Sequence, residues 1–285
     1  MRVIYQNSKD MKRTKSIFAI GLALMGIMAL GSCKLSNDRN IKNIDKKFYN
    51  RDGLVTLGSQ GNADKYTMGG ASLDAKKVKE LEIDWLGDEV SICAYDGNEL
   101  VFSETSDETL ADNTTVHYRL DDDGTLEIVF GKPGVKMEGK EVPDKRLTVK
   151  VPRTLLLEKV ELNGIGYTVQ MDSVRCEDLE VNHVSNNIVL NECEIETVEV
   201  NGVSTIVEAT FSKLPEEMEL NNVSGSTMLY VPENAGISIE SSGLISDFES
   251  DLPCSRKGSK RIIGDGSCKI ESNTVTGSLE IHVKD

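Results

Sequence analysis

Hydrophobic and polar positions recur in four similar segments between residues 157 and 231. The segments read LEKVELNGIG, CEDLEVNHVS, IETVEVNGVS and PEEMELNNVS, and they begin at Leu157, Cys176, Ile195 and Pro215. Each follows the pattern apolar-x-x-apolar-Glu-apolar-Asn-x-apolar, with proline as the first residue of the fourth segment. Their asparagines are 19, 19 and 20 residues apart. A step this short is typical of one coil of a solenoid.

Each repeat predicts two β-strands. The alternation in Val160-Glu161-Leu162 has the two-residue period of a half-buried strand. A second, shorter strand-like segment follows in every repeat, at 167–171, 187–190, 205–209 and 227–231. We therefore predict an all-β fold, a β-solenoid or β-roll of 19–20-residue coils, with regular repeats over 152–240. Leucine-rich repeats open with similar spacing, but a returning strand in a 19-residue unit leaves no room for a helix.

Stacking the coils, with strands about 4.8 Å apart, predicts columns of identical side chains, namely an amide ladder at the strand ends and acidic columns at the outward positions. One column is an amide ladder of Asn163, Asn182, Asn201 and Asn221. Two further columns are acidic, namely Glu161, Glu180, Glu199 and Glu219, and beside them Glu158, Glu177, Glu196 and Glu216.

The acidic columns have two interpretations. Like charges on neighbouring strands cost stability. The columns could serve solubility and protect the sheet against edge-to-edge pairing. They could instead form a face that binds a cation such as calcium, or a basic partner. No dedicated calcium-loop spacing occurs, and we predict no cofactor.

The segments on either side of the repeats predict the ends of the solenoid. Strand-like segments at 90–95 and 100–103 flank an Asp-Gly turn, as do those at 116–120 and 125–130, which predicts two hairpins. Solenoid ends need caps that differ from the repeats. We assign 78–151 and 241–285 to the two caps.

The chain has five cysteines besides Cys33, so at least one of them lacks an internal partner. Cys254 and Cys268 flank a loop in the C-terminal part and are the best candidates for a disulfide. An exported chain can keep such a bond. No spacing of a redox or zinc motif is present, and no metal site is predicted.

The N-terminus predicts export and lipid anchoring. Three basic residues, Lys12, Arg13 and Lys15, precede an apolar run at 17–30 that is too short to span a bilayer comfortably. The run ends in Leu-Gly-Ser-Cys33, which resembles a bacterial lipobox. That resemblance implies cleavage before Cys33 and acylation of its thiol, with palmitate as the expected chain, and of its new amino group. Residues 34–65 are polar and predict a tether, with a short first strand at Leu54–Leu57 as the alternative. The expected location is the bacterial cell envelope, on its surface or its periplasmic side.

The charge of the chain excludes some classes of function. Residues 1–32 hold five basic and one acidic residue, so their removal changes the formal net charge from −15 to −19. Such an acidic body repels nucleic acid, which excludes nucleic-acid binding. No Gly-x-Ser-x-Gly elbow, His-Glu-x-x-His motif or phosphate loop occurs, so no enzyme is predicted. A carbohydrate-active β-helix enzyme would need a groove with basic or paired acidic groups.

The whole domain is similar to a known family. YTMGGASLDAKKVKELEIDWLGDEVSICAYDGNELVFSETS at 66–106, LDDDGTLEIVF at 120–130 and KRLTVKVPRTLLLEKVELNGIG at 145–166 precede the Asn-x-Val-Ser repeats. Together they resemble the bacterial putative-adhesin family of exported or membrane-tethered domains, related to LiaG-like proteins. The resemblance covers 66–285, implies a β-solenoid or β-roll, and supplies no catalytic residues. The chain departs from the family pattern in its cysteines and at His183, where a small residue usually follows the asparagine.

These observations lead to one functional expectation and to one alternative besides the carbohydrate-active β-helix enzyme. We expect a non-catalytic, lipid-anchored module for binding, adhesion or scaffolding, attached to the membrane through Cys33 and directed at a protein or glycan ligand. The alternative is a periplasm-side accessory protein in envelope stress sensing.

Overall fold

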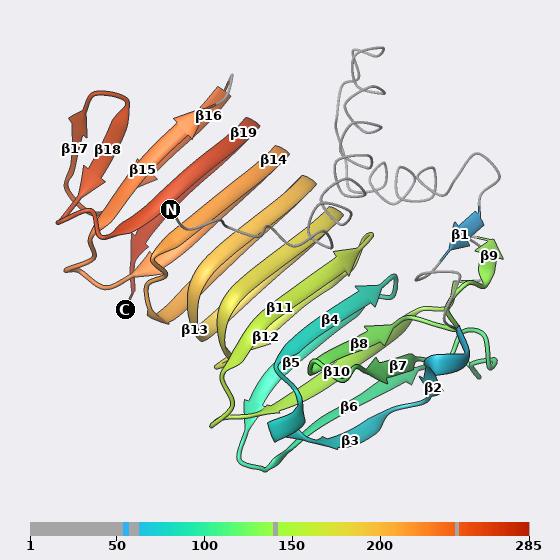
Figure 1. Ribbon diagram of the computed structural model, residues 1–285. Helices are drawn as coiled ribbons and strands as arrows, with labels where there is room; N and C mark the ends of the chain where they lie inside the picture. Colours follow the sequence, from blue (N-terminus) through green and yellow to red (C-terminus); the bar gives the residue numbers. More distant parts are fainter. Residues whose placement is uncertain (1–53, 57–62, 139–141, 243–244, 285) are drawn as a thin grey trace, which may run out of the picture. The chain divides into compact units, whose positions relative to one another are not determined.

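The computed structural model describes residues 54–56, 63–138, 142–242 and 245–284. These residues form an all-β fold in which 17 strands belong to one sheet that curls into stacked coils (Figure 1). A separate antiparallel pair joins β1 (Leu54–Thr56) to β9 (Lys136–Glu138). Two short 3-10 helices, η1 (Ala63–Lys65) and η2 (Ala75–Lys77), are also present. Among the described residues, no helix has the length and apolar character needed to cross a membrane. The predicted all-β solenoid is therefore confirmed.

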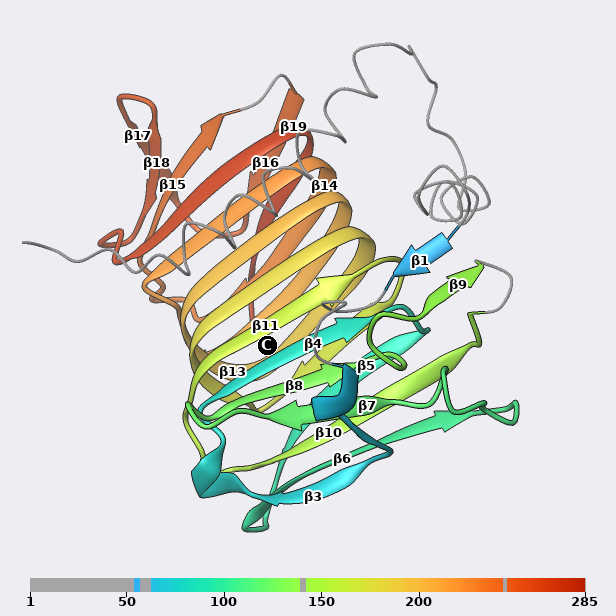
Figure 2. The ribbon, with the colours of Figure 1, turned by 45° about the vertical axis from the view of Figure 1, so that its right-hand side comes forward.

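Four coils carry the repeats at the centre of the solenoid (Figure 2). Their strands are β11 (Leu157–Gly164), β12 (Thr168–Asp172), β13 (Arg175–Lys213) and β14 (Glu217–Val231). The strands pair in parallel, with Asn163 beside Asn182 and Asn201 beside Asn221. This register follows from the sequence, because a slip by one residue would turn the apolar side chains outward.

The core is a continuous aliphatic column between the two faces of the coils. Val160, Leu162 and Val169 are fully buried, and Leu179 and Leu220 are 1% exposed. Burial of one such side chain stabilises the fold by about 1.5–3 kcal/mol. Each coil contributes only a few of these side chains, so the stability of a coil depends on its neighbours.

The N-terminal end stacks in an order that differs from the sequence. Its strands are β2 (Thr67–Met68), β3 (Ala71–Asp74), β4 (Glu80–Trp85), β5 (Glu89–Tyr95), β6 (Glu99–Ser106), β7 (His117–Leu120), β8 (Thr125–Val129) and β10 (Lys145–Pro152). β4 and β5 pair in parallel with β11 and β12, although five strands separate them in the chain. β8 and β10 pair in parallel with the opposite edges of β4 and β5.

One of the two predicted hairpins is present and the other is not. β7 and β8 pair in antiparallel fashion around the acidic turn, as expected. The hairpin predicted from 90–95 and 100–103 is wrong, because β10 pairs with both β5 and β6. β5 already has β10 on one edge and β12 on the other, so β6 cannot pair with it directly.

A buried lysine holds this end together. Lys145 is 1% exposed, and its ammonium donates to Glu104 and to the backbone carbonyls of Thr114 and Phe130. The ammonium also lies 4.8 Å from the ring centroid of Trp85 and 4.1 Å from that of Phe130. Burial lowers the pKa of Lys145 to about 8, and the hydrogen bond with Glu104 opposes this shift. The lysine is therefore a structural cation whose charge is satisfied internally.

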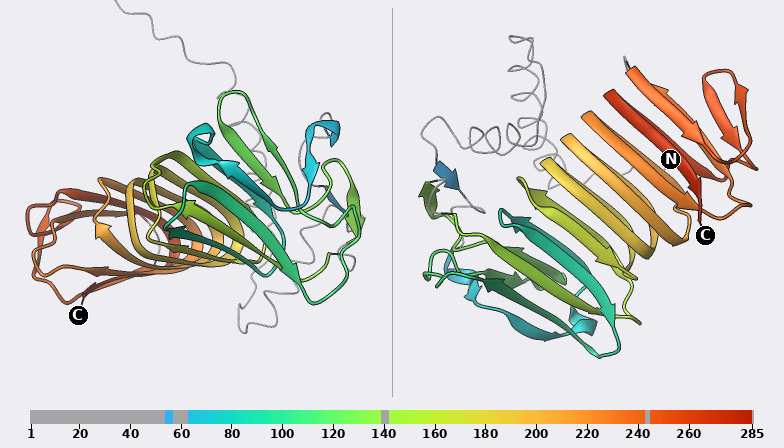
Figure 3. Two further views of the ribbon diagram at one scale, coloured as in Figure 1. Left: turned by 90° about the horizontal axis from the view of Figure 1, so that it is seen from below. Right: turned by 180° about the vertical axis from the view of Figure 1, so that it is seen from behind.

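At the C-terminal end, the last strand forms a regular coil inside the stack. The strands here are β15 (Ile237–Ser242), β16 (Ile245–Ser250), β17 (Cys254–Lys257), β18 (Lys260–Ile263) and β19 (Cys268–Val283). β19 pairs with β14 on one side and with β15 and β16 on the other (Figure 3). The cap is thus smaller than the predicted 241–285 and consists of β15–β18, with the β17–β18 hairpin covering an edge of β15.

Candidate functional site

The predicted amide ladder is present, and it is longer than the repeats. Asn182 Nδ2 donates to Asn163 Oδ1 at 3.0 Å, and Asn201 Nδ2 donates to Asn182 Oδ1 at 3.0 Å. Asn221 and Asn273 continue the ladder at 2.9 Å per step. All these bonds run in one direction along the solenoid, so every rung donates to the rung before it and accepts from the rung after it.

The two ends of the ladder match this direction. Asn163 donates to a carboxylate oxygen of Asp84 at 3.1 Å, and the hydroxyl of Ser242 donates to Asn273 at 2.5 Å. Asp84 needs only to accept a hydrogen bond at its end of the ladder, which a carboxylate does, and Ser242 needs only to donate one at the other end.

Each rung also binds the glutamate two residues before it. Asn163, Asn182, Asn201 and Asn221 donate to Oε1 of Glu161, Glu180, Glu199 and Glu219 at 3.1, 2.8, 2.8 and 3.0 Å. An amide has two N–H donors. In Asn163, Asn182, Asn201 and Asn221 both donors are used, one along the ladder and one on the glutamate, so these four amides are structural and offer no free N–H to a ligand.

The inner acidic column runs the length of the solenoid. The register places Glu127 beside Glu82, Glu82 beside Glu161, and Glu219 beside Glu271, which lies beside Glu240. Four of these positions, Glu82, Glu127, Glu240 and Glu271, were not assigned to the column from sequence. The signal was present in the apolar-Glu-apolar triplets at 81–83 and 126–128, but only the tertiary order brings them into line.

Two lysines lie between successive carboxylates of the acidic face. Lys159 Nζ is 2.9 Å from Glu161 and 2.5 Å from Glu180, so its ammonium bridges two coils. Partial burial lowers the pKa of Lys159, but the hydrogen bonds with Glu180 and Glu161 outweigh it and raise the pKa. Lys269 Nζ also bridges two coils, lying 2.6 Å from Glu271 in the inner column and 2.8 Å from Glu217, which is beside Lys269 in the register and outside that column.

The middle of the inner column has no such cation. Among the described residues, no lysine or arginine binds Glu199 or Glu219. Thr197 and Glu217 occupy the positions equivalent to Lys159 in these two coils. One carboxylate oxygen of each glutamate accepts from the ladder. The pair therefore presents two adjacent carboxylates at the centre of the face.

The outer column is exposed. Glu158, Glu177, Glu196 and Glu216 are all exposed at the start of their coils. Glu158 has a weak ion pair with Lys79 at 3.7 Å. The backbone N–H of Glu216 donates to the carbonyl of Glu196 at 2.8 Å, which fixes their side-by-side placement.

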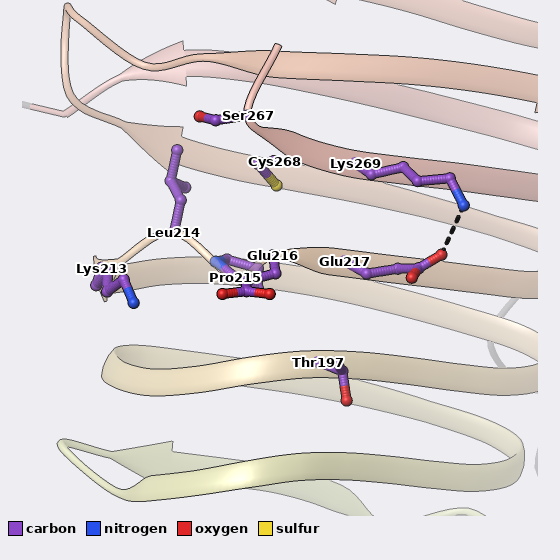
Figure 4. Close-up of a pocket in the computed structure, with 9 residues that line it drawn as sticks. All are labelled: Thr197, Lys213, Leu214, Pro215, Glu216, Glu217, Ser267, Cys268 and Lys269. Atoms are coloured by element: carbon purple, nitrogen blue, oxygen red, sulfur yellow. Dashed lines mark hydrogen bonds and ion pairs between the residues drawn. The ribbon is translucent and has the colours of Figure 1, made fainter.

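A groove with a volume of about 500 Å³ lies beside the outer acidic column at Glu216. Its lining residues are Thr197, Lys213, Leu214, Pro215, Glu216, Glu217, Ser267, Cys268 and Lys269 (Figure 4). The figure shows Lys269 turned toward Glu217, with Cys268 above Pro215 and Glu216. Burial raises the pKa of the Cys268 thiol to about 12, so this thiol is not an activated nucleophile.

The predicted disulfide between Cys254 and Cys268 is not formed, and both thiols are free. The register explains why, because Cys268 lies beside Ile237, Ile237 beside Ile263, and Ile263 beside Cys254. Three strand spacings of about 4.8 Å separate the two cysteines, roughly 14 Å in all. A disulfide requires Cα atoms within about 7 Å.

Two further points of the sequence analysis concern the lipid anchor and metal binding. Cys33 with its lipobox lies outside the described residues, as does nearly all of the tether at 34–65. Within the described ranges, no group of three or more His, Cys, Asp or Glu side chains is arranged to hold a metal ion.

The stacked coils and the asparagine ladder that links them define a β-solenoid repeat protein. The chain belongs to the Toastrack DUF4097 family, whose model matches residues 76–282. A comparison with curated proteins found no match.

Two solved structures are similar. One is described as a "putative cell adhesion protein" from Clostridium sporogenes, with 11% identity and a TM-score of 0.41 over 77% of this chain and 100% of that chain. The other is a "putative adhesin" from Bacteroides fragilis, with 11% identity and a TM-score of 0.30 over 77% of this chain and 97% of that chain.

Proposed function

We propose that the protein is a non-catalytic binding module of the bacterial cell envelope, anchored by lipid on Cys33. We further propose that it binds a polypeptide partner through basic side chains placed on Glu199 and Glu219. The anchor is supported by the basic n-region, the short apolar run and the lipobox-like sequence that ends at Cys33. More than one acyl chain gives stable membrane attachment.

The observation that carries the proposed binding mode is the placement of Lys159. Its ammonium lies between the carboxylates of two successive coils, 2.9 and 2.5 Å from them. Glu199 and Glu219 present an equivalent pair two coils further on, and no lysine among the described residues binds either carboxylate. A lysine or arginine of a partner can occupy that position with the same geometry, because the coils repeat. Opposite charges across such an interface favour association and orient the partner.

The same hydrogen bonds favour a polypeptide over a glycan at this face. A neutral glycan is recognised largely through hydrogen bonds, and the ladder amides have already used both of their donors. Glutamate carboxylates accept only. The face therefore presents negative charge and acceptors, which match ammonium and guanidinium groups.

A binding measurement tests the face. The full-length protein, solubilised in detergent, is titrated with a lysine-rich peptide and with an uncharged peptide of equal length at low salt. The double variant Glu199→Gln/Glu219→Gln should bind the lysine-rich peptide about five-fold more weakly, since exposed ion pairs contribute roughly 0.2–1 kcal/mol each.

The control is Glu208→Gln/Glu249→Gln, which removes the same charge from exposed glutamates on the returning strands. Equal weakening by both double variants would show a general charge effect and refute a defined site.

The anchor is tested separately. Cys33→Ser should move the protein from the membrane fraction to the soluble fraction and abolish labelling by a palmitate analogue. Unchanged membrane association and labelling would refute lipid anchoring. A C-terminal tag reached by a non-penetrating protease on intact cells would place the domain on the surface, and a tag reached only after lysis would place it on the periplasmic side.

A further inference from the structure

The corner of the central coils contains buried polar side chains without partners. They lie where the first strand of a coil turns into the second. His183, Asn186, Thr205 and Asn222 are 6, 8, 1 and 6% exposed. Within the described part of the chain, six of their atoms have no hydrogen-bond partner, namely both ring nitrogens of His183, Nδ2 and Oδ1 of Asn186, Oγ1 of Thr205 and Oδ1 of Asn222.

These side chains belong to three successive coils and lie next to one another. Coils two and three are offset by 19 residues, as the bond from Asn201 to Asn182 shows, so Asn186 lies beside Thr205. The same offset places His183 beside Gly202, and Gly202 lies beside Asn222 on the following coil.

Gly202 provides the space in which the polar atoms meet. A Cβ at this position would lie 2.1 Å from Thr205 Oγ1 and 2.8 Å from Asn222 Oδ1. The two oxygens therefore approach the backbone of Gly202 from the same direction. On the other side, the ring of His183 packs edge-on against Tyr167, with centroids 4.3 Å apart.

An unpaired buried polar group costs about 1–3 kcal/mol. Buried polar groups in proteins are almost always paired, with protein atoms or with ordered water. Several unpaired groups in one corner would cost more than a marginally stable domain can tolerate. A small bound molecule that satisfies these groups is the alternative.

The chemistry of the four side chains decides which molecule this is. Thr205, Asn186 and Asn222 are uncharged, and burial lowers the pKa of His183 to about 3, so its imidazole is neutral. No carboxylate or thiolate belongs to the cluster, so a buried cation would lack a counter-charge. The four side chains include both donors and acceptors, and a water molecule can both accept from the donors and donate to the acceptors.

We propose that this corner is an internal hydration site in which ordered water bridges His183, Asn186, Thr205 and Asn222 across three coils. A buried water typically makes about three hydrogen bonds, so six unpaired atoms correspond to about two molecules. The bridging water links side chains of three successive coils.

The primary test is a crystal structure of the mature protein at neutral pH, at a resolution that shows ordered solvent. The expected result is density within about 2.7–3.2 Å of at least two of the four side chains. A corner without density in an otherwise well-hydrated map would overturn the proposal. A peak with anomalous signal and bonds of about 2.1 Å to His183 would also overturn it, because it would identify a metal ion.

A substitution gives an independent test, because a hydrated corner and a dry corner predict opposite changes in melting temperature. Asn186→Leu removes two of the polar atoms that hold the water. If the site is hydrated, the water and the neighbouring groups lose hydrogen-bond partners, and the melting temperature should fall. In a dry corner the same change would remove an unpaired amide and raise the melting temperature. The matched control is Asn187→Leu at the exposed neighbouring position, where little change is expected. Water-¹⁷O relaxation dispersion should detect long-lived water in the parent protein and less of it in Asn186→Leu.

Discussion

Asn201→Asp tests the amide ladder at its centre with almost no change in side-chain shape. The substitution removes two donated bonds, to Asn182 at 3.0 Å and to Glu199 at 2.8 Å, and keeps the bond accepted from Asn221. Two such bonds contribute about 2 kcal/mol together. The new carboxylate also lies near Glu199, and two charges about 4 Å apart repel by about 1 kcal/mol in water. We therefore expect a loss of about 3 kcal/mol in the free energy of unfolding.

Urea unfolding of the parent protein and the variant measures this loss. Asn187→Asp is the control, because it adds the same charge at an exposed asparagine of the preceding coil that lies outside the ladder. In 1 M salt the Debye length is about 3 Å, so the repulsion is screened and a loss of about 2 kcal/mol should remain. If Asn201→Asp costs no more than Asn187→Asp, the ladder does not stabilise the stack and the reasoning is wrong.

Three further predictions concern the interior. Gly202→Ala should destabilise the fold and lower the melting temperature by several degrees, because the added Cβ would lie 2.1 Å from Thr205 Oγ1; an unchanged melting temperature would contradict the tight corner. Burial lowers the folded-state pKa of His183 to about 3, so stability is lost as pH falls from about 6.5 toward 3, by about 2 kcal/mol at pH 5; urea unfolding at pH 7.5 and 5 should show this dependence in the parent protein and lose it in His183→Asn. Lys145→Met should cost about 3 kcal/mol or more, because a buried carboxylate and two carbonyls lose their donor; chemical unfolding of the two proteins measures the difference, and a loss under 1 kcal/mol would contradict the structural role of the lysine.

The ladder accounts for the tolerance of the acidic face. Like charges stacked on neighbouring strands are destabilising when nothing compensates them. Here the glutamates of the four repeats each accept one N–H from the ladder, and lysines bind the inner-column glutamates on either side of Glu199 and Glu219, Lys159 at Glu180 and Lys269 at Glu271. Within the four repeats, the inner-column glutamates without a lysine are Glu199 and Glu219, which is where we place the partner.

The sequence by itself determined the local architecture of the central coils. The two-residue alternation and the 19–20-residue step can both be read directly from the sequence. They were enough to predict strands, coils, the asparagine ladder and the acidic columns. Similar neighbours in successive coils leave one register that buries the alternating apolar side chains of the first strands, so the local pattern also determined how the repeats stack.

Only the tertiary structure decided the order of the coils at the two ends. β19 lies between β14 and β15 because its pattern, Ile270-Glu271-Ser272-Asn273, completes the ladder as well as a consecutive coil would. Its asparagine comes 52 residues after Asn221, so no fixed step in the sequence reveals it. The separation of Cys254 from Cys268 depends on the same insertion. Parallel strands pair through side-chain and backbone complementarity rather than through proximity in the chain, and for that reason the sequence specified each coil while the folded structure specified their order.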